Sequence, residues 1–513
     1  MMIALSIAGR ARHVMLRILG SHNPFRNGVN RREAMCVAGL SALSLGLPEL
    51  LKLQSLQAGE RPHGKTFGKA KRILLVYLQG AATQHETWDP KPDAPKGIRG
   101  AFGATPTSVP GVDISDGLPK MAQLMHRVAL VRSMTHKYNN HSNHYTLTGY
   151  PTVNFSSETN PFDSRHHPFF GSVLDYLAEQ QADNSQPAGL PRNIGLPWKF
   201  SSFSPVFRRS GPYGAFLGHA FDPVWTEFDG KATKTVNRSS FFQRKDVEVK
   251  DPFLGVTPGS RLRISKTARM RRGMTLDRLD RRRSLLQQLE SETRRFETTN
   301  AGRSVDRFRG MAYSLMTSEK LRQALDVGQE PMSRREEYGM TLFGQSCLTA
   351  RRLLEAGCGL VSVFWDEYVI VNTAWDTHSR QPSRLRDELH PGLDAGLSSL
   401  LSDLETRGLL DETLVMCLTE HGRTPKLNKR ASRDHWSNVY SVMLAGAGIR
   451  PGTVVGSSDR QGGFVKSRPV SPEDVLATMY HLKGIDPETT IPDRLKRPVK
   501  LVANGTQIDE LLL

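Results

Sequence analysis

The sequence predicts an α/β protein in which a mainly parallel central sheet is flanked by helices. Five continuous apolar runs have the length and composition of strands buried on both faces. They are residues 72–80, 128–134, 359–365, 413–419 and 440–446. Helical patterns separate several of these runs, for example at residues 389–410. Strands that alternate with helices favour a largely parallel sheet covered on both sides.

The middle of the chain, from about residue 180 to 340, breaks this alternation. It is rich in Pro, Ser and Arg at first and becomes helical after Gly273. Leu276, Leu279, Leu286 and Leu289 follow helical spacing with arginines between them, which is typical of an amphipathic helix. We expect this inserted helical and irregular segment to lie outside the central sheet.

The clearest predicted helix lies near the C-terminus. Ser471 is a suitable N-cap, a proline occupies the first turn, and an acidic residue follows at the third helical position. Gly484 is placed to end this helix.

The first 58 residues resemble a twin-arginine export signal. Arg31 and Arg32 precede a mildly apolar stretch, residues 34–47, that Pro48 ends. This stretch is too short to span a bilayer core of ~30 Å, so no transmembrane span is expected in the mature chain. We therefore expect a signal at 1–58, a linker at 59–71 and one α/β domain at 72–513. The destination would be the periplasm or the cell surface.

The net charge of +18 does not by itself indicate nucleic-acid binding. Residues 1–72 hold twelve Lys and Arg against three Asp and Glu, so half of the excess lies in the leader and linker. Much of the rest falls at residues 261–309, where fifteen basic residues face six acidic ones. No recognition module surrounds this run, and a solvated helix face is the simpler interpretation. No nucleic-acid partner is expected.

Acidic and histidine side chains follow the predicted strands in four places. Carboxylates and imidazoles bind divalent metals, and imidazole favours the transition metals. Because the carboxyl ends of parallel strands meet at one edge of a sheet, these side chains are expected to converge there. The pattern predicts a site for one or two ions of Zn, Mn or Mg. Its candidate ligands are Glu86, Asp89, Asp376, His378, Glu420, His421 and His435, with Asp434 beside the last.

Two further residue groups are candidates for catalysis. Residues 135–145 contain His136, His141 and His144, of which one is a possible general base or a further metal ligand. A polar loop without catalytic function explains the same segment equally well. Arg423 is suited to hold an anionic oxygen with two hydrogen bonds, and pairing with Glu420 is the alternative. His141 and Arg423 are therefore the candidate catalytic residues.

Several motifs together resemble one family over nearly the whole chain. They are "TWDPKPDAP", "YTLTGYPT", "AWDTH", "EHGRTPK", "RDHW" and "GSSDR", with the C-terminal helix. This combination is similar to the family called domain of unknown function 1501. More remotely, "LTGYP", "TEHG" and "DVLATMYHLKGI" resemble the alkaline phosphatase and sulfatase superfamily. The resemblance implies a sulfatase-like fold and a metal-dependent ester hydrolase.

The sequence departs from these relatives at positions that matter for chemistry. The position of the sulfatase nucleophile falls near Asn139, whose side chain cannot attack phosphorus or sulfur. Glu420 replaces the usual aspartate of the superfamily, and His421 stands where most members of the closer family carry phenylalanine. Glu86 and Asp89 stand where relatives usually show two aspartates.

The combined expectation is an exported metal-dependent hydrolase of an anionic ester, either a phosphate or a sulfate. Its partner would be an anionic small molecule or a sulfated or phosphorylated glycan. The alternative is a pseudo-enzyme of the same fold that binds a glycan or a partner protein without turnover. The missing nucleophile favours the pseudo-enzyme, whereas the retained Asp, Glu and His clusters favour the enzyme.

Overall fold

A computed structural model describes residues 64–513, apart from residues 153, 182–189, 241–244, 265–299 and 371–372. The chain divides into two units, Met1–His63 and Gly64–Leu513, and only the second is described here. The predicted export signal at 1–58 and the start of the linker therefore lie outside the described residues. So does the predicted amphipathic helix of residues 276–289.

Within the described residues, nine strands form one central sheet in the order β15-β4-β14-β11-β1-β10-β5-β6-β9. All neighbouring strands are parallel except those that pair with β14 or β9. The mainly parallel sheet and the five predicted apolar strands are thus confirmed. The strands are β1 (Arg72–Leu78), β4 (Val128–Met134), β5 (Asn193–Leu196), β6 (Val224–Asp229), β9 (Arg261–Ile264), β10 (Leu360–Trp365), β11 (Thr413–Leu418), β14 (Tyr440–Ala445) and β15 (Val454–Val455).

The expectation that residues 180–340 lie outside this sheet is wrong. Strands β5, β6 and β9 come from that segment and form one side of the sheet, with β5 parallel to β10. β5 has only four residues and β9 alternates apolar with arginine, so neither shows the long apolar run that marks a buried strand. Part of the segment does lie outside the sheet, including α10 (Asn300–Thr317), α11 (Glu319–Leu325) and α12 (Met332–Glu337).

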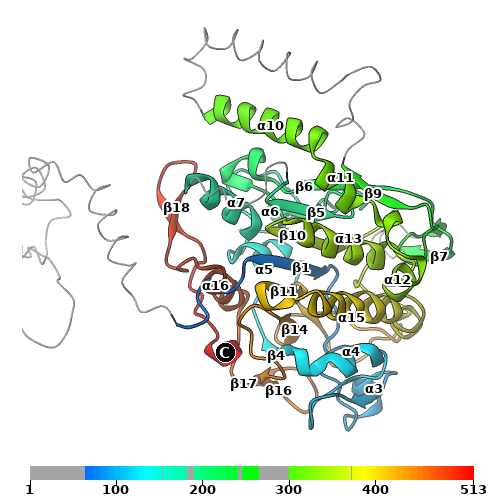
Figure 1. Ribbon diagram of the computed structural model, residues 1–513. Coiled ribbons are helices and arrows are strands. Elements are labelled where there is room, and N and C mark those ends of the chain that lie inside the picture. Colours follow the sequence, from blue (N-terminus) through cyan, green and yellow to red (C-terminus); the bar gives the residue numbers. More distant parts are fainter. Residues whose placement is uncertain (1–63, 153, 182–189, 241–244, 265–299, 371–372) are drawn as a thin grey trace, which may run out of the picture. The chain divides into compact units, whose positions relative to one another are not determined.

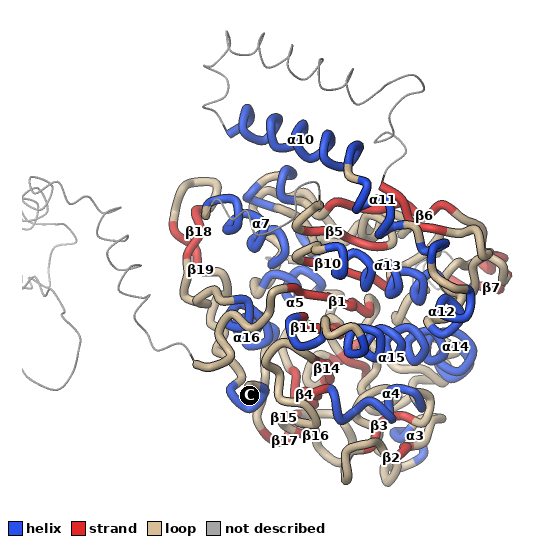
Figure 2. Tube along the Cα trace, in the orientation of Figure 1, coloured by secondary structure: helices blue, strands red, loops and turns tan. Residues whose placement is uncertain are grey.

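Helices cover both faces of the sheet (Figures 1 and 2). One face packs against α4 (Pro119–Leu124), α13 (Leu342–Ala356) and α15 (His390–Thr406). The other packs against α5 (Asn143–Thr148), α7 (Phe170–Gln180) and α16 (Pro472–Lys483). In β1, Leu74 and Val76 join the first core while Ile73 and Leu75 join the second, as the alternation of side chains along a strand requires.

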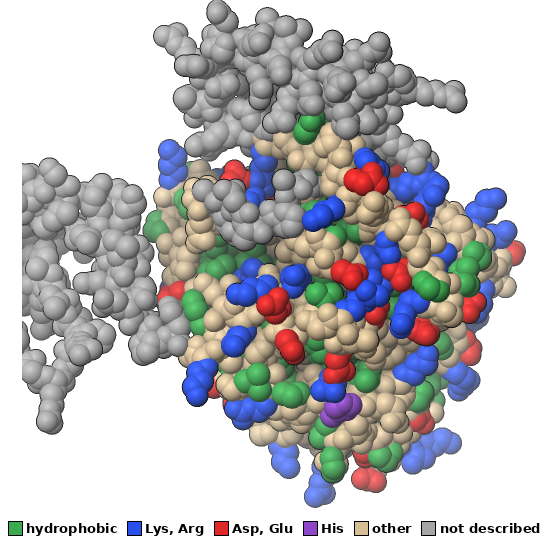
Figure 3. All heavy atoms as spheres, viewed as in Figure 1, with side chains coloured by type: hydrophobic (Ala, Val, Ile, Leu, Met, Phe, Trp, Pro, Cys, Tyr) green, Lys and Arg blue, Asp and Glu red, His purple; other side chains and the backbone are tan. Residues whose placement is uncertain are grey.

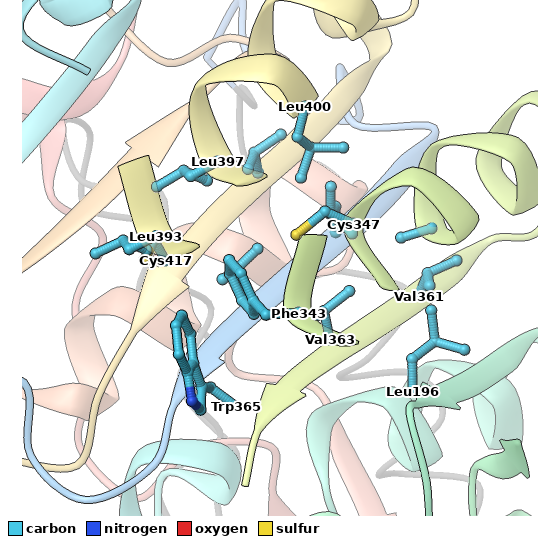
Figure 4. Packing of buried hydrophobic residues seen from close by; sticks show 14 of the residues in the cluster. Leu196, Phe343, Cys347, Val361, Val363, Trp365, Leu393, Leu397, Leu400 and Cys417 are labelled. Atoms are coloured by element: carbon cyan, nitrogen blue, oxygen red, sulfur yellow. The ribbon is translucent and has the colours of Figure 1, made fainter. Parts of the chain in front are cut away.

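Figure 4 shows the first core, in which side chains of α13 and α15 point towards β10 and β11. Phe343 and Cys347 of α13 meet Leu397 of α15 and Trp365 of β10 in this layer. Burial raises the pKa of the Cys347 thiol well above its usual value, which agrees with a structural role. Removing such apolar surface from water is the main term that holds the layers together.

The predicted C-terminal helix is confirmed as α16. Its N-cap, Ser471, accepts from the backbone N–H of Asp474, whose carboxylate accepts in return from the Ser471 backbone. Gly484 ends it with a φ of 83°, in the left-handed region that favours glycine.

The remaining elements are short. The other helices are α3 (Lys96–Arg99), α6 (Phe155–Glu158) and α14 (Gln381–Arg384). Two-stranded pairs are β2 (Ala104–Pro106) with β3 (Asp113–Ser115), β7 (Thr235–Ser240) with β8 (Lys245–Lys250), β12 (Gly422–Arg423) with β13 (His435–Trp436), β16 (Ser457–Ser458) with β17 (Val465–Ser467), and β18 (Thr490–Pro492) with β19 (Pro498–Lys500). On the face in Figure 3, basic and acidic side chains are interspersed. Among the described helices, none is long and apolar enough to cross a bilayer.

Candidate metal centre

The sheet brings segments from four parallel strands and one antiparallel strand to the same edge. β1, β4, β10 and β11 share one direction, so the residues that follow them emerge together. Gly80, His141, Asp376 and Glu420 lie in those following segments. β14 runs the opposite way, so His435, which precedes it, enters the same space.

Asp376 lies at the centre of the resulting cluster and is almost fully buried. Its Oδ2 lies 3.3 Å from Nε2 of His141, and its Oδ1 lies 3.0 Å from Nε2 of His378 and 3.3 Å from Nε2 of His435. Arg423 donates to the same Oδ1. Burial alone would raise the pKa of Asp376, but the charges of His141 and Arg423 hold it well below its usual value.

His141 connects Asp376 to Glu420. Its Nδ1 donates to Oε1 of Glu420 over 2.8 Å, and the same oxygen accepts from the backbone N–H of Gly80 over 2.7 Å. Burial lowers the pKa of His141, but the Asp376 carboxylate raises it more strongly, to about 9. Burial likewise raises the pKa of Glu420, while the hydrogen bond from His141 brings it below the usual value. Without a metal, the imidazolium therefore supplies the positive charge between two carboxylates.

His421 is fully buried beside this cluster and has a free ring nitrogen. Its Nδ1 donates to the carbonyl of Gly422 over 2.8 Å, whereas its Nε2 has no hydrogen-bond partner in the part of the chain that the structure describes. The His421 ring centre lies 4.7 Å from that of His435 and 5.7 Å from that of His141. Burial and the nearby His435 hold the pKa of His421 well below its usual value, so the ring is neutral. A neutral imidazole that donates one nitrogen to a backbone carbonyl presents its other lone pair as metal ligands do.

The donor set fits a divalent metal. Two groups of side chains have potential ligand atoms within 4.8 Å of one another, and they share His435: one is His141, His421 and His435, the other Asp376, His378 and His435. Tetrahedral zinc sites use imidazole and carboxylate ligands of this kind. Imidazole ligands favour zinc over magnesium, which prefers oxygen ligands, and the carboxylate of Asp376 also suits manganese.

Glu86, Asp89 and Glu420, all expected as metal ligands, belong to neither group. Glu420 reaches the cluster through its hydrogen bond with His141. Glu86 forms a buried ion pair with Arg433, with Oε1 2.6 Å from Nη2. Burial raises the pKa of Glu86, but the Arg433 charge brings it below its usual value. Asp89 accepts from Lys91 over 2.8 Å and from the hydroxyl of Ser458. The carboxylates of Glu86 and Asp89 therefore both have cationic partners, and these contacts hold the loop after β1 in place instead of forming part of the metal cluster.

Arg423 is enclosed in the protein and does not face a substrate. It pairs with Asp376, not with Glu420, and donates also to the carbonyls of Gly80, Ala81 and Arg433. These bonds occupy its N–H groups, so the structure corrects its expected role as an anion clamp. Arg423 instead positions Asp376.

The other expected residues occupy the surroundings of the cluster. His136 donates to the backbone carbonyl of Glu420 over 2.7 Å, and His144 packs against His166. Among the three histidines of residues 135–145, His141 is thus the one in contact with Asp376. Asn139 accepts from the backbone N–H of Ser437 over 3.0 Å, a structural role.

The structure also reveals a buried cation that sequence reasoning missed. Arg209 is 3% exposed and comes from the segment interpreted as an insertion. No local pattern marked it, because the run "FRRSG" at 207–211 looks like a solvated basic loop.

Comparison with known proteins assigns the chain to a family. The family described as Protein of unknown function (DUF1501) matches residues 70–512. The chain belongs to this family. No protein of curated function matches this DUF1501 chain in sequence.

The DUF1501 chain also aligns with solved structures, three of which are a phosphonate hydrolase, a sulfatase and a lipoteichoic acid synthase. The phosphonate monoester hydrolase SpPMH from Silicibacter pomeroyi is 13% identical, with a TM-score of 0.34 over 80% of this chain and 73% of that chain. The sulfatase PsFucS1 from Pseudoalteromonas sp. is 11% identical, with a TM-score of 0.33 over 85% and 70%. The lipoteichoic acid synthase LtaP from Listeria monocytogenes is 9% identical, with a TM-score of 0.34 over 86% and 78%. These values describe a distant resemblance.

Proposed function

We propose that this protein is an exported metal-dependent hydrolase of an anionic ester, a phosphate or a sulfate. The observation that carries the proposal is the buried Nε2 of His421, which lies beside His141 and His435 and has no partner among the described residues. A buried polar atom without a partner costs about 1–3 kcal/mol, and an ion bound at this point removes that cost. We propose one or two ions, with zinc or manganese ahead of magnesium.

A bound divalent ion would supply a Lewis acid and lower the pKa of water at the site. The protein's own groups hold the geometry. Arg423 fixes Asp376, and the backbone N–H of Gly80 fixes Glu420. Asp434 accepts from Nδ1 of His378 over 3.0 Å and so orients that ring.

The reaction we propose is attack by water on the phosphorus or sulfur, which breaks the ester bond, passes a proton to the leaving alcohol and releases inorganic phosphate or sulfate. Thr419, the hydroxyl residue next to Glu420, donates its proton to the carbonyl of Leu78 over 2.8 Å. Asn139, at the expected position of a nucleophile, has a carboxamide that cannot attack the ester. His141 is the group placed to hold or give a proton, because it contacts both Asp376 and Glu420.

Metal binding is the first test. The full chain, purified without chelator and then equilibrated with zinc or manganese, should bind one or two ions measured by elemental analysis. H421A should weaken binding at least 10-fold, by analogy with the effect of changing groups that support a metal site. His126 is an exposed histidine hydrogen-bonded to Ser108, and H126A is the matched control. Wild-type protein that binds neither metal, or H421A that binds as wild type does, contradicts the proposal.

Turnover is the second test. Aryl phosphate and aryl sulfate esters should be hydrolysed by the loaded protein, with activity lost on chelation and restored by metal. Natural substrates of the same chemistry would be anionic small molecules or sulfated or phosphorylated glycans.

A specific observation favours a second candidate, a pseudo-enzyme that binds a glycan or partner protein. The charge of Asp376 is already compensated by Arg423 and His141, so this carboxylate does not require a metal. Metal binding without turnover of any ester, together with binding of a sulfated glycan, would support this candidate.

Export is proposed from Arg31 and Arg32. Replacing both with lysine should retain the protein in the cytoplasm, whereas unchanged delivery to the periplasm or cell surface would show that another signal operates.

A further inference from the structure

Arg209 is a buried cation that forms no ion pair within the described residues. Its side chain has no hydrogen bond or ion pair with any residue that the structure describes, and its Nε is buried without a partner. Phe207 covers one side of the guanidinium, with Cζ 5.2 Å from the ring centre, but an aromatic ring does not neutralise the charge. Buried charges are normally paired or bind an ion, so an unpaired one indicates a missing anion.

The backbone holds Arg209 against the segment that follows His141. Its own N–H donates to the hydroxyl of Ser201 over 2.7 Å, and the next residue, Ser210, donates to the carbonyl of Glu158 over 2.8 Å. A Cβ built on Gly211 would lie 3.6 Å from Cβ of Asn143, so this stretch packs directly on α5. Arg209 is thus fixed between the start of α5 and the C-terminal end of α6, which carries Glu158.

Two neutral donors in the same region also lack partners. The hydroxyl of Ser142 and Nδ2 of Asn143 are buried and unbonded within the described residues, although Oδ1 of Asn143 accepts from Tyr77. Both residues follow His141 directly in the sequence. A guanidinium, an amide and a hydroxyl are the groups that bind a tetrahedral oxyanion.

The carboxylate of Glu158 makes no hydrogen bond with Arg209 within the described residues. Glu158 accepts instead from the hydroxyl of Thr152 over 2.8 Å. Burial raises the pKa of Glu158 to about 7, although the Thr152 hydrogen bond and the Arg209 charge both lower it.

We propose that Arg209, with Asn143 and Ser142, binds the phosphoryl or sulfuryl group of the ester beside the metal centre. This inference rests on the proposed hydrolase function and assigns its anion-binding side. Arg209 takes the role that Arg423 cannot fill, because the hydrogen bonds of Arg423 are all internal.

The test measures binding of inorganic sulfate and of inorganic phosphate to the full chain by calorimetry, against chloride at equal ionic strength. Separate sulfate and phosphate titrations distinguish the two ester classes. R209Q should weaken binding about 10- to 100-fold, as loss of a charge-assisted, bidentate contact does. Arg208 is exposed and adjacent, and the matched control R208Q should change binding less than about twofold. Wild type that binds neither anion, or R209Q that binds as wild type does, overturns the proposal.

A second variant separates anion binding from a structural role. R209M removes the buried charge, so in chloride buffer its melting temperature should equal or exceed that of wild type, and sulfate should no longer raise it. A lower melting temperature in chloride would show that Arg209 stabilises the fold and would overturn the proposal. All of these anion-binding and melting measurements use metal-free protein. A failure to bind metal would therefore refute the hydrolase function without affecting the measured anion binding.

Discussion

Replacing Gly80 with alanine tests how the edge of the sheet positions Asp376. Gly80 has a φ of 108°, a region that residues with a Cβ rarely adopt. A Cβ at this position would lie 2.2 Å from the backbone nitrogen of Asp376 and 2.7 Å from the carbonyl carbon of Trp375. The first distance falls 1.2 Å short of the 3.4 Å at which ordinary contact begins. Because both neighbours are backbone atoms, Asp376 itself has to move.

The expected cost has two parts. The left-handed conformation costs an alanine about 1–2 kcal/mol, and overpacking against backbone costs about 1–3 kcal/mol more. Gly218, with a φ of 92° and nothing within 4 Å of its Cβ position, is the matched control, so G218A should lose only the first part. A displacement of about 1 Å at Asp376 should in addition weaken metal binding about 10- to 100-fold, as loss of a supporting contact does.

Chemical denaturation gives the unfolding free energy of each variant, and competition with a chelating dye gives its metal affinity. G80A should be the less stable of the two and the only one with impaired metal binding. If G80A matches G218A in both measurements, the close approach of Gly80 to Asp376 does not organise the site, and the reasoning fails.

Three further predictions follow from buried charges and from the metal site. The pKa of Glu158 is about 7 in the folded protein against an ordinary 4.5, so the folded state retains a proton that the unfolded state has already released. The free energy of unfolding should therefore fall by up to about 3 kcal/mol as pH rises from 4.5 through 7. E158Q should flatten this pH dependence in denaturation curves. E227Q, on the exposed side of β6, is the control and should leave it unchanged. E86A leaves Arg433 buried without its carboxylate and should cost about 3–5 kcal/mol of unfolding free energy. E510A, which breaks an exposed ion pair, should cost less than about 1 kcal/mol. Equal losses in the two variants would contradict the burial of the Glu86–Arg433 pair. Free zinc at 100 times its dissociation constant should raise the unfolding free energy of the wild type by about 2.7 kcal/mol. If a chelator leaves the melting curve of the zinc-loaded protein unchanged, the metal does not stabilise the fold.

The sequence by itself determined five adjacent strands of the sheet, namely β4, β14, β11, β1 and β10, and the edge at which polar residues gather. Apolar runs such as residues 72–78 predict strands because both faces must be buried, and that requirement is local. Ser471, Asp474 and Gly484 determined α16 for the same reason, because caps act within one turn of the helix. The convergence of Asp376 and Glu420 followed from the expected parallel strand direction, whereas His435 reaches the site because β14 is antiparallel, which the sequence did not predict.

Only the tertiary structure decided which partner each charge takes. Glu86 and Arg433 are 347 residues apart in the chain, and nothing local distinguishes that pair from the pair of Asp376 with Arg423. The same holds for β5, which reads as a strand only once β10 and β6 lie on either side of it. Arg209 shows this dependence on tertiary structure most clearly. Its sequence neighbours are typical of a solvated loop, whereas the side chain is buried in the folded protein, where this stretch packs against α5. Propensity and capping act over a few residues, whereas desolvation of a charge depends on every element that surrounds it, and that environment exists only in the folded chain.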